Sequence, residues 1–217
     1  MSNSKLETQN SKLHLEHALI AECGPVLIAG VDEAGRGALA GPVVAAALIL
    51  PLDAPAQLAR LAQVNDSKQL TALQRERLFT LIQEVALSCG VGMVDAAAID
   101  QMGILPATKE AMRQAIVALS PAPGFVLVDG NVGLKNITFP NRPIIRGDGL
   151  SLSIAAASII AKVTRDRLMV ALSQQYPTYQ FARHKGYGTP QHLALLAQHG
   201  PSPSHRYSFA PLRATLL

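Results

Sequence analysis

Two adjacent acidic residues, Asp32 and Glu33, follow the apolar run 26–31 and come just before a glycine-rich turn. Gly35 and Gly37 allow a sharp turn there and a close approach of the backbone to a ligand. The two carboxylates would face opposite sides of a regular strand, but at a strand end loosened by glycine both could turn toward one ion. Carboxylates at the rim of a buried strand indicate a cation site, because burying an unpaired charge is costly.

A second acidic site lies at Asp129, which closes the apolar run 125–128 and is again followed by glycine. Carboxylates at the ends of neighbouring strands can converge at one sheet edge, which is where open α/β sheets bind ligands. Taken alone, Asp129 could equally be a turn residue that caps its own backbone.

The next candidate is either Asp148 or Asp166, which are 18 residues apart. If that segment is mostly helical, a rise of about 1.5 Å per residue separates them by up to ~27 Å, so only one can belong to the site. Asp166 lies between two arginines, which is typical of an exposed ion-pair residue. Asp148 lies between glycines in a loop and can reach inward, so we choose Asp148.

A competing interpretation is a dinucleotide-binding loop, because Gly35, Gly37 and Ala40 match the glycine pattern that follows the first strand of such folds. The chain then runs through residues 41–42 into an apolar, strand-like run instead of opening a helix. The acidic pair before the glycines would also repel a pyrophosphate. Both observations disfavour the dinucleotide interpretation.

Apolar runs and helical periodicity predict the elements that must position these carboxylates. Thr71 and Gln74 form a possible capping box. We expect strands over 26–31, 43–50, 90–94, 125–128 and 143–146, and helices over 67–88, 106–119, 151 to about 175, and 189–200. Strands and helices mixed in this order predict an α/β sheet flanked by helices. The expected organisation is an N-terminal extension without chemistry (1–24), a catalytic domain (25–175) and a basic, aromatic-containing helical extension (176–217).

Composition narrows the class of protein. The 217 residues are 49% hydrophobic, which is enough for one sizeable core. No stretch is apolar for long enough to span a membrane, and two cysteines without ligand-like spacing predict neither a disulfide framework nor a zinc site. We therefore expect a soluble, cytoplasmic protein.

Charge is distributed unevenly along the chain. From Lys162 onward there are seven basic residues and one acidic residue, and all four tyrosines lie in this part. Interleaved bases and aromatics suit a nucleic-acid backbone, although a solvated basic surface would have the same composition.

Several motifs, in order along the chain, together resemble the bacterial ribonuclease HII family: VDEAGRG from Val31, AGPVVAAA from Ala40, NDSK from Asn65, VDG from Val128, RGDG from Arg146, SIAAASIIAKVTRDR from Ser153 and HKGYGT from His184. The resemblance covers about Ile28 to Pro211. It implies a ribonuclease H-like fold, with a five-stranded mixed sheet flanked by helices and a helical C-terminal extension. It also implies cleavage on the 5′ side of a ribonucleotide in duplex DNA, or within the RNA of an RNA/DNA hybrid, leaving a 3′-hydroxyl and a 5′-phosphate.

The resemblance also assigns roles to residues. The family's metal-binding carboxylates fall on Asp32, Glu33, Asp129 and Asp148, which implies two-metal catalysis with Mg²⁺ or Mn²⁺. Its ribose-sensing segment falls on Gly35, Arg36 and Gly37, and its junction-reading tyrosine on Tyr187. Phosphate contacts are expected from Lys68, Lys162, Arg183 and Lys185. Arg36 could instead only pair with Glu33, and Tyr187 could be a packed aromatic. The partners implied are RNA/DNA hybrids and duplex DNA that contains ribonucleotides, with no membrane, and the expected state is a monomer.

Two other functions compete with this one. The first is a nucleic-acid-binding module on the same scaffold that has lost catalysis, and the intact carboxylates argue against it. The second is a different nuclease that shares two-metal chemistry, such as a resolvase or an integrase. The Gly35–Gly37 segment and Tyr187 argue against that class.

Overall fold

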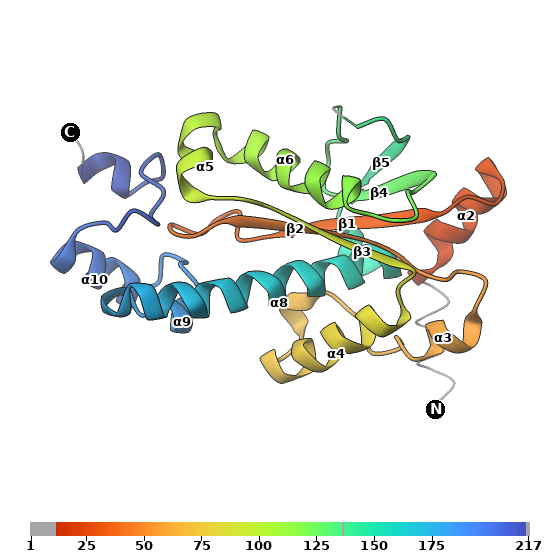
Figure 1. Ribbon diagram of the computed structural model, residues 1–217, viewed down its shortest axis with the longest axis horizontal. Helices are drawn as coiled ribbons and strands as arrows, with labels where there is room; N and C mark the ends of the chain where they lie inside the picture. Colours follow the sequence, from red (N-terminus) through yellow and green to blue (C-terminus); the bar gives the residue numbers. More distant parts are fainter. Residues whose placement is uncertain (1–11, 136, 216–217) are drawn as a thin grey trace.

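A five-stranded mixed sheet forms the centre of the molecule, and the computed structural model describes residues 12–135 and 137–215 (Figure 1). The strands are β1 (Ile28–Ala34), β2 (Val43–Ile49), β3 (Ser88–Val94), β4 (Phe125–Asp129) and β5 (Asn141–Ile144). Their order is β3-β2-β1-β4-β5. The central strand β1 runs antiparallel to β2 and parallel to β4, which confirms the mixed sheet.

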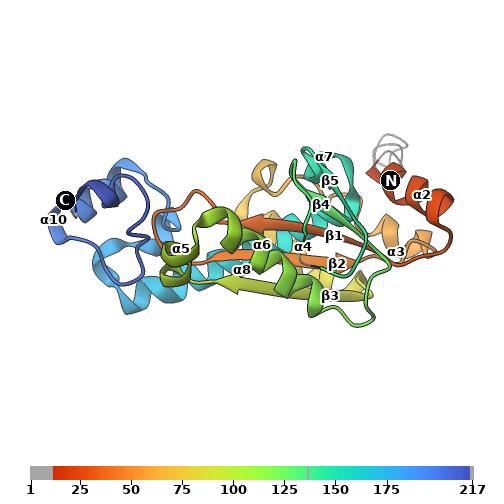
Figure 2. The same ribbon diagram turned by 90° about the horizontal axis from the view of Figure 1, so that it is seen from above.

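Helices cover both faces of this sheet. They are α2 (His14–Cys23), α3 (Pro55–Ala59), α4 (Ala72–Val85), α5 (Ala96–Met102), α6 (Ile104–Val117), α7 (Gly147–Leu150), α8 (Leu152–Gln175), α9 (Phe181–His184) and α10 (Pro190–His199), with 3₁₀ turns at Ser67–Gln69, Pro177–Tyr179 and Leu212–Thr215. The long helix α8 and helix α4 lie below the sheet in Figure 1, and α5 and α6 lie above it. Figure 2 shows α2 and α10 at opposite ends of the molecule.

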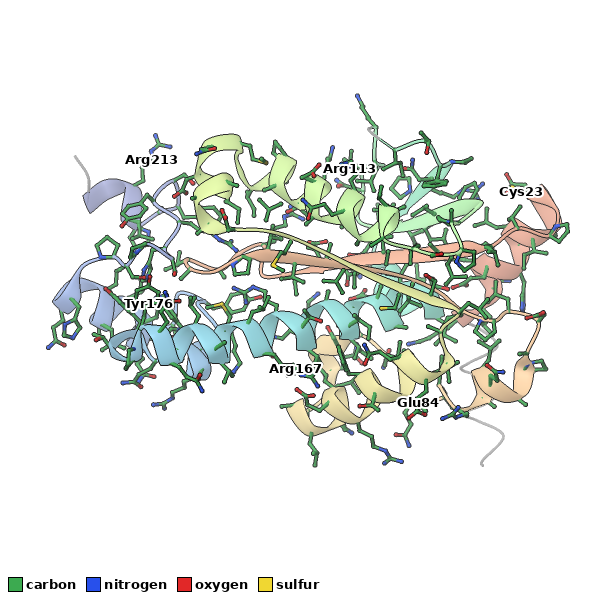
Figure 3. The ribbon with its side chains drawn as sticks, in the orientation of Figure 1. Cys23, Glu84, Arg113, Arg167, Tyr176 and Arg213 are labelled. Carbon is green, nitrogen blue, oxygen red and sulfur yellow. The ribbon has the colours of Figure 1, made fainter. Side chains whose placement is uncertain are left out.

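The core consists of two apolar layers separated by the sheet. Alternate residues of β1 and β2 enter different layers, because successive strand residues point to opposite faces. Val31 packs in the layer that contains α6, whereas Ala34 packs in the layer that contains α4 and α8. Side chains fill both layers in Figure 3, where Arg113 lies on the α6 side and Arg167 on the α8 side. A Cβ atom on Gly30 would lie 2.2 Å from the Ser153 carbonyl carbon, so glycine lets α8 pack directly on β1.

The structure differs from the expected elements in several places. The helix expected over 67–88 begins only at Ala72, because Asp66 caps the separate turn Ser67–Gln69 and Thr71 caps α4. The capping box of Thr71 and Gln74 is confirmed. The last strand lies at Asn141–Ile144 rather than 143–146, and helices α3, α5, α7 and α9 were not expected.

The first residues of the chain contribute more to the fold than an extension without chemistry would. Residues 1–11 lie outside the described residues, but α2 follows them and buries the carboxylate of Glu16. Glu16 Oε1 accepts hydrogen bonds from Ser151 Oγ at 2.6 Å and from the Ser153 backbone N–H at 3.1 Å. Helix α2 therefore supports the start of α8, immediately after the short helix α7 that carries Asp148.

Among the described residues, none of the helices combines the length and the apolar character that crossing a membrane requires.

Candidate active site

The acidic pair lies within strand β1 rather than beyond its end. The strand continues to Ala34, so the backbone alternation starts Asp32 and Glu33 on opposite faces of the sheet, yet the charge of Glu33 still acts on the Asp32 carboxylate. Asp32 lies on the α8 side of the sheet, next to Ser158. Glu33 instead lines a cleft beside α6. Regular pairing with β2 up to Ala34 keeps the alternation intact.

Asp129 lies at the end of β4, next to β1. The two strands are parallel, with Val31 opposite Val128, so Asp129 follows at the level of Asp32. Asp129 Oδ1 accepts a hydrogen bond of 2.7 Å from the backbone N–H of Gly147, the first residue of α7. This bond places Asp148, the next residue of α7, beside the end of β4. The sequence thus correctly predicts that carboxylates from neighbouring strands meet at one edge of the sheet.

Burial and neighbouring negative charges act on three of the four carboxylates. Burial raises the pKa of Asp32 well above its ordinary value, and the charges of Glu33 and Asp129 raise it further. The pKa of Glu33 is also raised, mainly by burial, with Arg36 opposing and Asp129 adding to the shift. Burial, Asp66 and Asp129 raise the pKa of Asp148. Asp129 is therefore the one carboxylate that acts on the other three.

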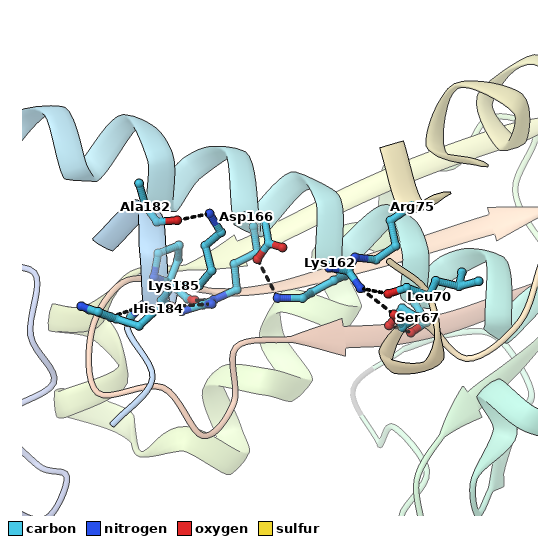
Figure 4. Close-up of polar contacts among 12 residues, drawn as sticks. Ser67, Leu70, Arg75, Lys162, Asp166, Ala182, His184 and Lys185 are labelled. Atoms are coloured by element: carbon cyan, nitrogen blue, oxygen red, sulfur yellow. Dashed lines mark hydrogen bonds and ion pairs between the residues drawn. The ribbon is translucent and has the colours of Figure 1, made fainter. Parts of the chain in front are cut away.

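Asp166, the alternative to Asp148, lies apart from this group. Its Oδ1 atom is 2.7 Å from Lys162 Nζ, one helical turn away on α8 (Figure 4). Asp148 Oδ2 instead lies 3.8 Å from Lys68 Nζ. The structure therefore brings Asp148, and not Asp166, to the carboxylates of β1 and β4.

The donor set is suitable for a hard divalent cation, although the carboxylates are not gathered around one point. Throughout the described part of the chain, no three Asp, Glu, His or Cys side chains form a group ready to hold a metal ion. Asp32 and Asp129 each direct one oxygen to a backbone N–H, and Glu33 lies 3.7 Å from Arg36 Nη1. However, the donors are all oxygen atoms, which Mg²⁺ and Mn²⁺ prefer, and the buried Asp32 forms no ion pair with any described residue.

A cleft of about 340 Å³ opens between the carboxylates and α6. Glu33, Arg36 and Asp129 line one side of it, and Thr108 and Lys109 of α6 line the other. No sequence motif marks these α6 residues, because they belong to an ordinary amphipathic helix. Thr108 and Lys109 line the cleft only because α6 packs across the sheet at this position.

The glycine-rich turn after β1 contains two glycines in different situations. Gly35 has a φ of +88°, and a Cβ atom there would lie 1.8 Å from Arg165 Nε. At Gly37, a Cβ atom would meet no described atom within 4 Å. The fold therefore requires glycine at position 35, whereas the space beside Gly37 is open to a ligand.

Two buried arginines hold this turn in place, and no sequence motif predicts either role. Arg165 of α8 donates hydrogen bonds to the carbonyl oxygens of Ala40, Pro42 and Lys185. Arg206 donates from Nε to Gly41 O and from Nη1 to Arg36 O, each at 3.0 Å. Neither guanidinium forms an ion pair within residues 12–135 and 137–215. Burial and the neighbouring Arg165 lower the pKa of Arg206 to about 9.

Tyr187 lies on a loop that packs against the same turn. The Leu39 N–H donates to Gly186 O at 2.8 Å, and a Cβ on Gly186, whose φ is +79°, would lie 2.5 Å from Ala40 O. The Tyr187 ring remains 36% exposed, with Arg165 Cζ 5.4 Å from its centroid. The aromatic ring is thus at the surface beside the glycine-rich turn, rather than in the core.

The basic residues expected at the substrate surface have different surroundings. Arg183 is exposed, and Lys185 is half-buried and donates to Ala182 O (Figure 4). Lys162 pairs with Asp166 and lies 5.8 Å from the centre of the Tyr187 ring. Lys68 lies on the turn that Arg75 fixes by donating to the carbonyl oxygens of Ser67 and Leu70. Lys68 thus lies at the acidic cluster, and Lys162 lies at Tyr187.

Comparison with solved structures identifies the class of fold. The chain superposes on the ribonuclease H2 of Pyrococcus horikoshii with a TM-score of 0.71 and 31% identity, covering 86% of this chain and 95% of that one. It matches the ribonuclease HII in the PCNA:RNase HII complex from Archaeoglobus fulgidus with a TM-score of 0.68 and 28% identity, covering 79% and 87%. The sheet, its carboxylates and these likenesses define a nuclease of the ribonuclease H class.

Sequence comparison narrows the class to one family. Residues 29–212 match the ribonuclease HII family. The chain is 56% identical over 189 residues to ribonuclease HII of Geobacillus thermodenitrificans, covering 87% of this chain and 70% of that protein. It is 55% identical over 205 residues to ribonuclease HII of Chloroflexus aurantiacus, covering 94% and 96%. The chain belongs to the ribonuclease HII family, and it is therefore an endoribonuclease that acts on RNA/DNA hybrids.

Proposed function

We propose that this enzyme removes ribonucleotides from DNA by hydrolysing the phosphodiester on the 5′ side of a ribonucleotide in a DNA duplex, and that it cuts the RNA of RNA/DNA hybrids in the same way. The products carry a 3′-hydroxyl and a 5′-phosphate. The observation that carries the proposal is the position of Asp129, which follows at the level of Asp32 on the neighbouring strand, accepts a hydrogen bond from the Gly147 N–H and lines the same cleft as Arg36 of the glycine-rich turn.

In this proposal Asp32, Glu33, Asp129 and Asp148 hold two Mg²⁺ or Mn²⁺ ions. Bound ions of this kind activate water and neutralise the charge that develops on the phosphate. The protein supplies oxygen ligands on three separate elements, and α7 is fixed by the hydrogen bond from Gly147 to Asp129. Lys68 and Arg36, which now face Asp148 and Glu33, are free to move to substrate phosphates when cations take their places.

The ribose is read by the backbone of Gly35, Arg36 and Gly37. The Arg36 carbonyl points to Arg206, and the C=O and N–H of a trans peptide point in opposite directions. The Gly37 N–H therefore points away from Arg206. A hydrogen bond there to a 2′-hydroxyl would distinguish RNA from DNA.

Tyr187 reads the sugar that follows the ribonucleotide. Its half-open ring can pack on a deoxyribose, and the extra hydroxyl of a ribose would be less well accommodated. The ammonium group of Lys162 lies 5.8 Å from the centre of this ring, which supports a phosphate contact beside the sugar. Lys68, Lys162, Arg183 and Lys185 position the duplex through its phosphates without reading its sequence.

The experiment is to map the cut in a DNA duplex that carries one ribonucleotide, with Mg²⁺ or Mn²⁺ present. We expect a single nick on the 5′ side of the ribonucleotide and an upstream strand that a DNA polymerase extends directly, because its end is a 3′-hydroxyl. A cut on the 3′ side, or an end that the polymerase cannot extend before phosphatase treatment, would contradict the proposed reaction.

A further inference from the structure

Three buried histidines lie beneath the Tyr187 loop, outside the carboxylate site. They are His184 of α9, His192 of α10, and His205, which follows α10 in the C-terminal segment. The rings of His184 and His192 stack with their centroids 4.2 Å apart. His192 Nε2 and His205 Nε2 are 3.0 Å apart, so the two rings share one hydrogen bond.

The protons in this cluster can be assigned from its two ends. The Ser202 backbone N–H can only donate, and it lies 2.9 Å from His205 Nδ1, so that atom accepts and the proton is on Nε2. His205 Nε2–H then donates to His192 Nε2. This leaves the His192 proton on Nδ1, which donates to the Tyr187 carbonyl oxygen at 2.9 Å. A carbonyl can only accept, so the assignment from the second end agrees with the first.

Burial keeps these rings neutral, which the chain of hydrogen bonds requires. Burial lowers the pKa of His192, and burial together with His192 lowers the pKa of His205 to about 4. At neutral pH each ring therefore has one donor and one acceptor. The chain from Ser202 to Tyr187 is continuous and points in one direction.

This series of hydrogen bonds ends at the backbone carbonyl of Tyr187, the residue that we propose contacts the substrate. The Tyr187 carbonyl also accepts from the Thr189 N–H at 2.8 Å, and the Tyr187 N–H donates to His184 O at 3.0 Å. His192 is the one side chain in the described structure that fixes this peptide, because the other two bonds come from the loop itself. The hydrogen bond from His192 therefore helps to fix the position of the exposed Tyr187 ring.

We propose that His192, oriented by His205, is a positioning residue for Tyr187 and thereby sets the preference for a deoxyribose after the ribonucleotide. The inference rests on the proposed role of Tyr187. The new element is that the preference for a deoxyribose depends on a hydrogen-bond donor at the Nδ1 position of His192, a residue that we do not expect to touch the substrate.

Two variants separate this role from a general contribution to stability. In His192→Asn the side-chain amide occupies the place of Nδ1 and can still donate to the Tyr187 carbonyl, but it loses the contact with His205. In His192→Gln the amide reaches the place of Nε2, so it keeps the contact with His205 and loses the one with Tyr187. Each variant loses one hydrogen bond, so both unfolding temperatures should fall to a similar extent.

The measurement is the ratio of kcat/KM for a duplex with one ribonucleotide to kcat/KM for an RNA/DNA hybrid. This ratio does not depend on the folded fraction, because one preparation is assayed with both substrates. We expect His192→Gln to lower the ratio about fivefold, as for the loss of one net hydrogen bond. His192→Asn should stay near the wild-type ratio, as should the exposed control His199→Gln.

Equal ratios for His192→Asn and His192→Gln would overturn the positioning role. Tyr187→Ala is measured beside them, because it tests the proposed function separately. If Tyr187→Ala leaves the ratio unchanged, the junction-reading role of Tyr187 is wrong. If Tyr187→Ala lowers the ratio while His192→Gln does not, only the inference about His192 is wrong.

Discussion

Gly35 and Arg165 occupy adjoining space so closely that a methyl group on Gly35 would lie 1.8 Å from the Arg165 Nε atom. Arg165 is buried in α8 and holds three carbonyl oxygens, two on the turn after β1 and one on the Tyr187 loop. One side chain thus joins the two loops that we propose read the substrate. Gly37, two residues further on, has no such neighbour among the described residues.

The two glycines of the turn should therefore respond differently to the same substitution. Gly35→Ala forces a side chain against Arg165 at a positive φ, and we expect it to destabilise the fold by about 2 kcal/mol or more. Gly37→Ala should change the free energy of unfolding little but reduce cleavage at a ribonucleotide by at least about tenfold, because the methyl group fills the space proposed for the ribose. Denaturant unfolding and single-ribonucleotide cleavage measure the two effects. Full activity in Gly37→Ala would remove this turn from ribose recognition.

Arg206 should matter for recognition although it is buried away from the substrate surface. Arg206→Gln loses the two hydrogen bonds to Arg36 O and Gly41 O, so the peptide before Gly37 is no longer fixed. We expect the discrimination between a ribonucleotide and an all-DNA duplex to fall by about tenfold. The matched control is Arg213→Gln, an exposed arginine of the same C-terminal segment, which should behave like the wild type. Undiminished discrimination in Arg206→Gln at a temperature where it is folded would contradict this role.

The histidine cluster should make the fold sensitive to mild acid. The folded-state pKa of His205 is about 4, below the ordinary value of 6.5, so the unfolded chain takes up a proton first as the pH falls. This contribution to stability is complete above pH ~6.5 and is lost toward pH ~4. Between pH ~7 and ~5 the loss should be roughly 2 kcal/mol. Denaturant unfolding of wild type and His205→Gln gives the difference, and parallel pH profiles for the two proteins would show that His205 is not responsible.

Glu16 should stabilise the start of α8 from a helix far away in the sequence. Its buried carboxylate accepts two hydrogen bonds from the first turn of α8, so Glu16→Ala leaves a serine hydroxyl and a backbone N–H without this partner. We expect a loss of about 2 kcal/mol in the free energy of unfolding. Glu22→Ala, on the exposed end of the same helix, is the control and should cost less than about 1 kcal/mol. Equal losses of unfolding free energy for the two variants would show that the buried hydrogen bonds of Glu16 do not stabilise the fold.

Much of the sheet could be predicted because its strands are short apolar runs bounded by glycine, proline or a carboxylate. The convergence of Asp129 with the acidic pair followed from placing strand ends at one edge, and the choice of Asp148 over Asp166 followed from helix length and flanking charge. The turn Gly147–Leu150 could not be predicted, because it is formed by a bond from Gly147 to Asp129 and not by local periodicity. Helix α5 was missed although Asp95 is a proper cap, since only one glycine separates it from α6.

The burial of charged residues was the least predictable feature. Arg165 and Asp166 are neighbours in a charged stretch, yet Arg165 is fully buried and Asp166 is not. The sequence alone does not show which residues of a charged stretch point into the protein and which point to solvent. The long helix α8 is apolar on several sides in its first half and turns Arg165 toward the loops only because of how it crosses β1. The same holds for Arg206 and Glu16, whose partners lie more than a hundred residues away.

The central claim is that Asp129 links the carboxylates into one metal-dependent centre, and Asp129→Asn tests it most directly. The duplex with one ribonucleotide is incubated with wild type and variant in Mg²⁺ or Mn²⁺, and binding to the same duplex is measured without divalent metal. We expect cleavage to fall by at least about a thousandfold while the binding affinity stays within about twofold of wild type. Turnover retained by Asp129→Asn, or wild-type turnover that persists in a chelator, would contradict the account.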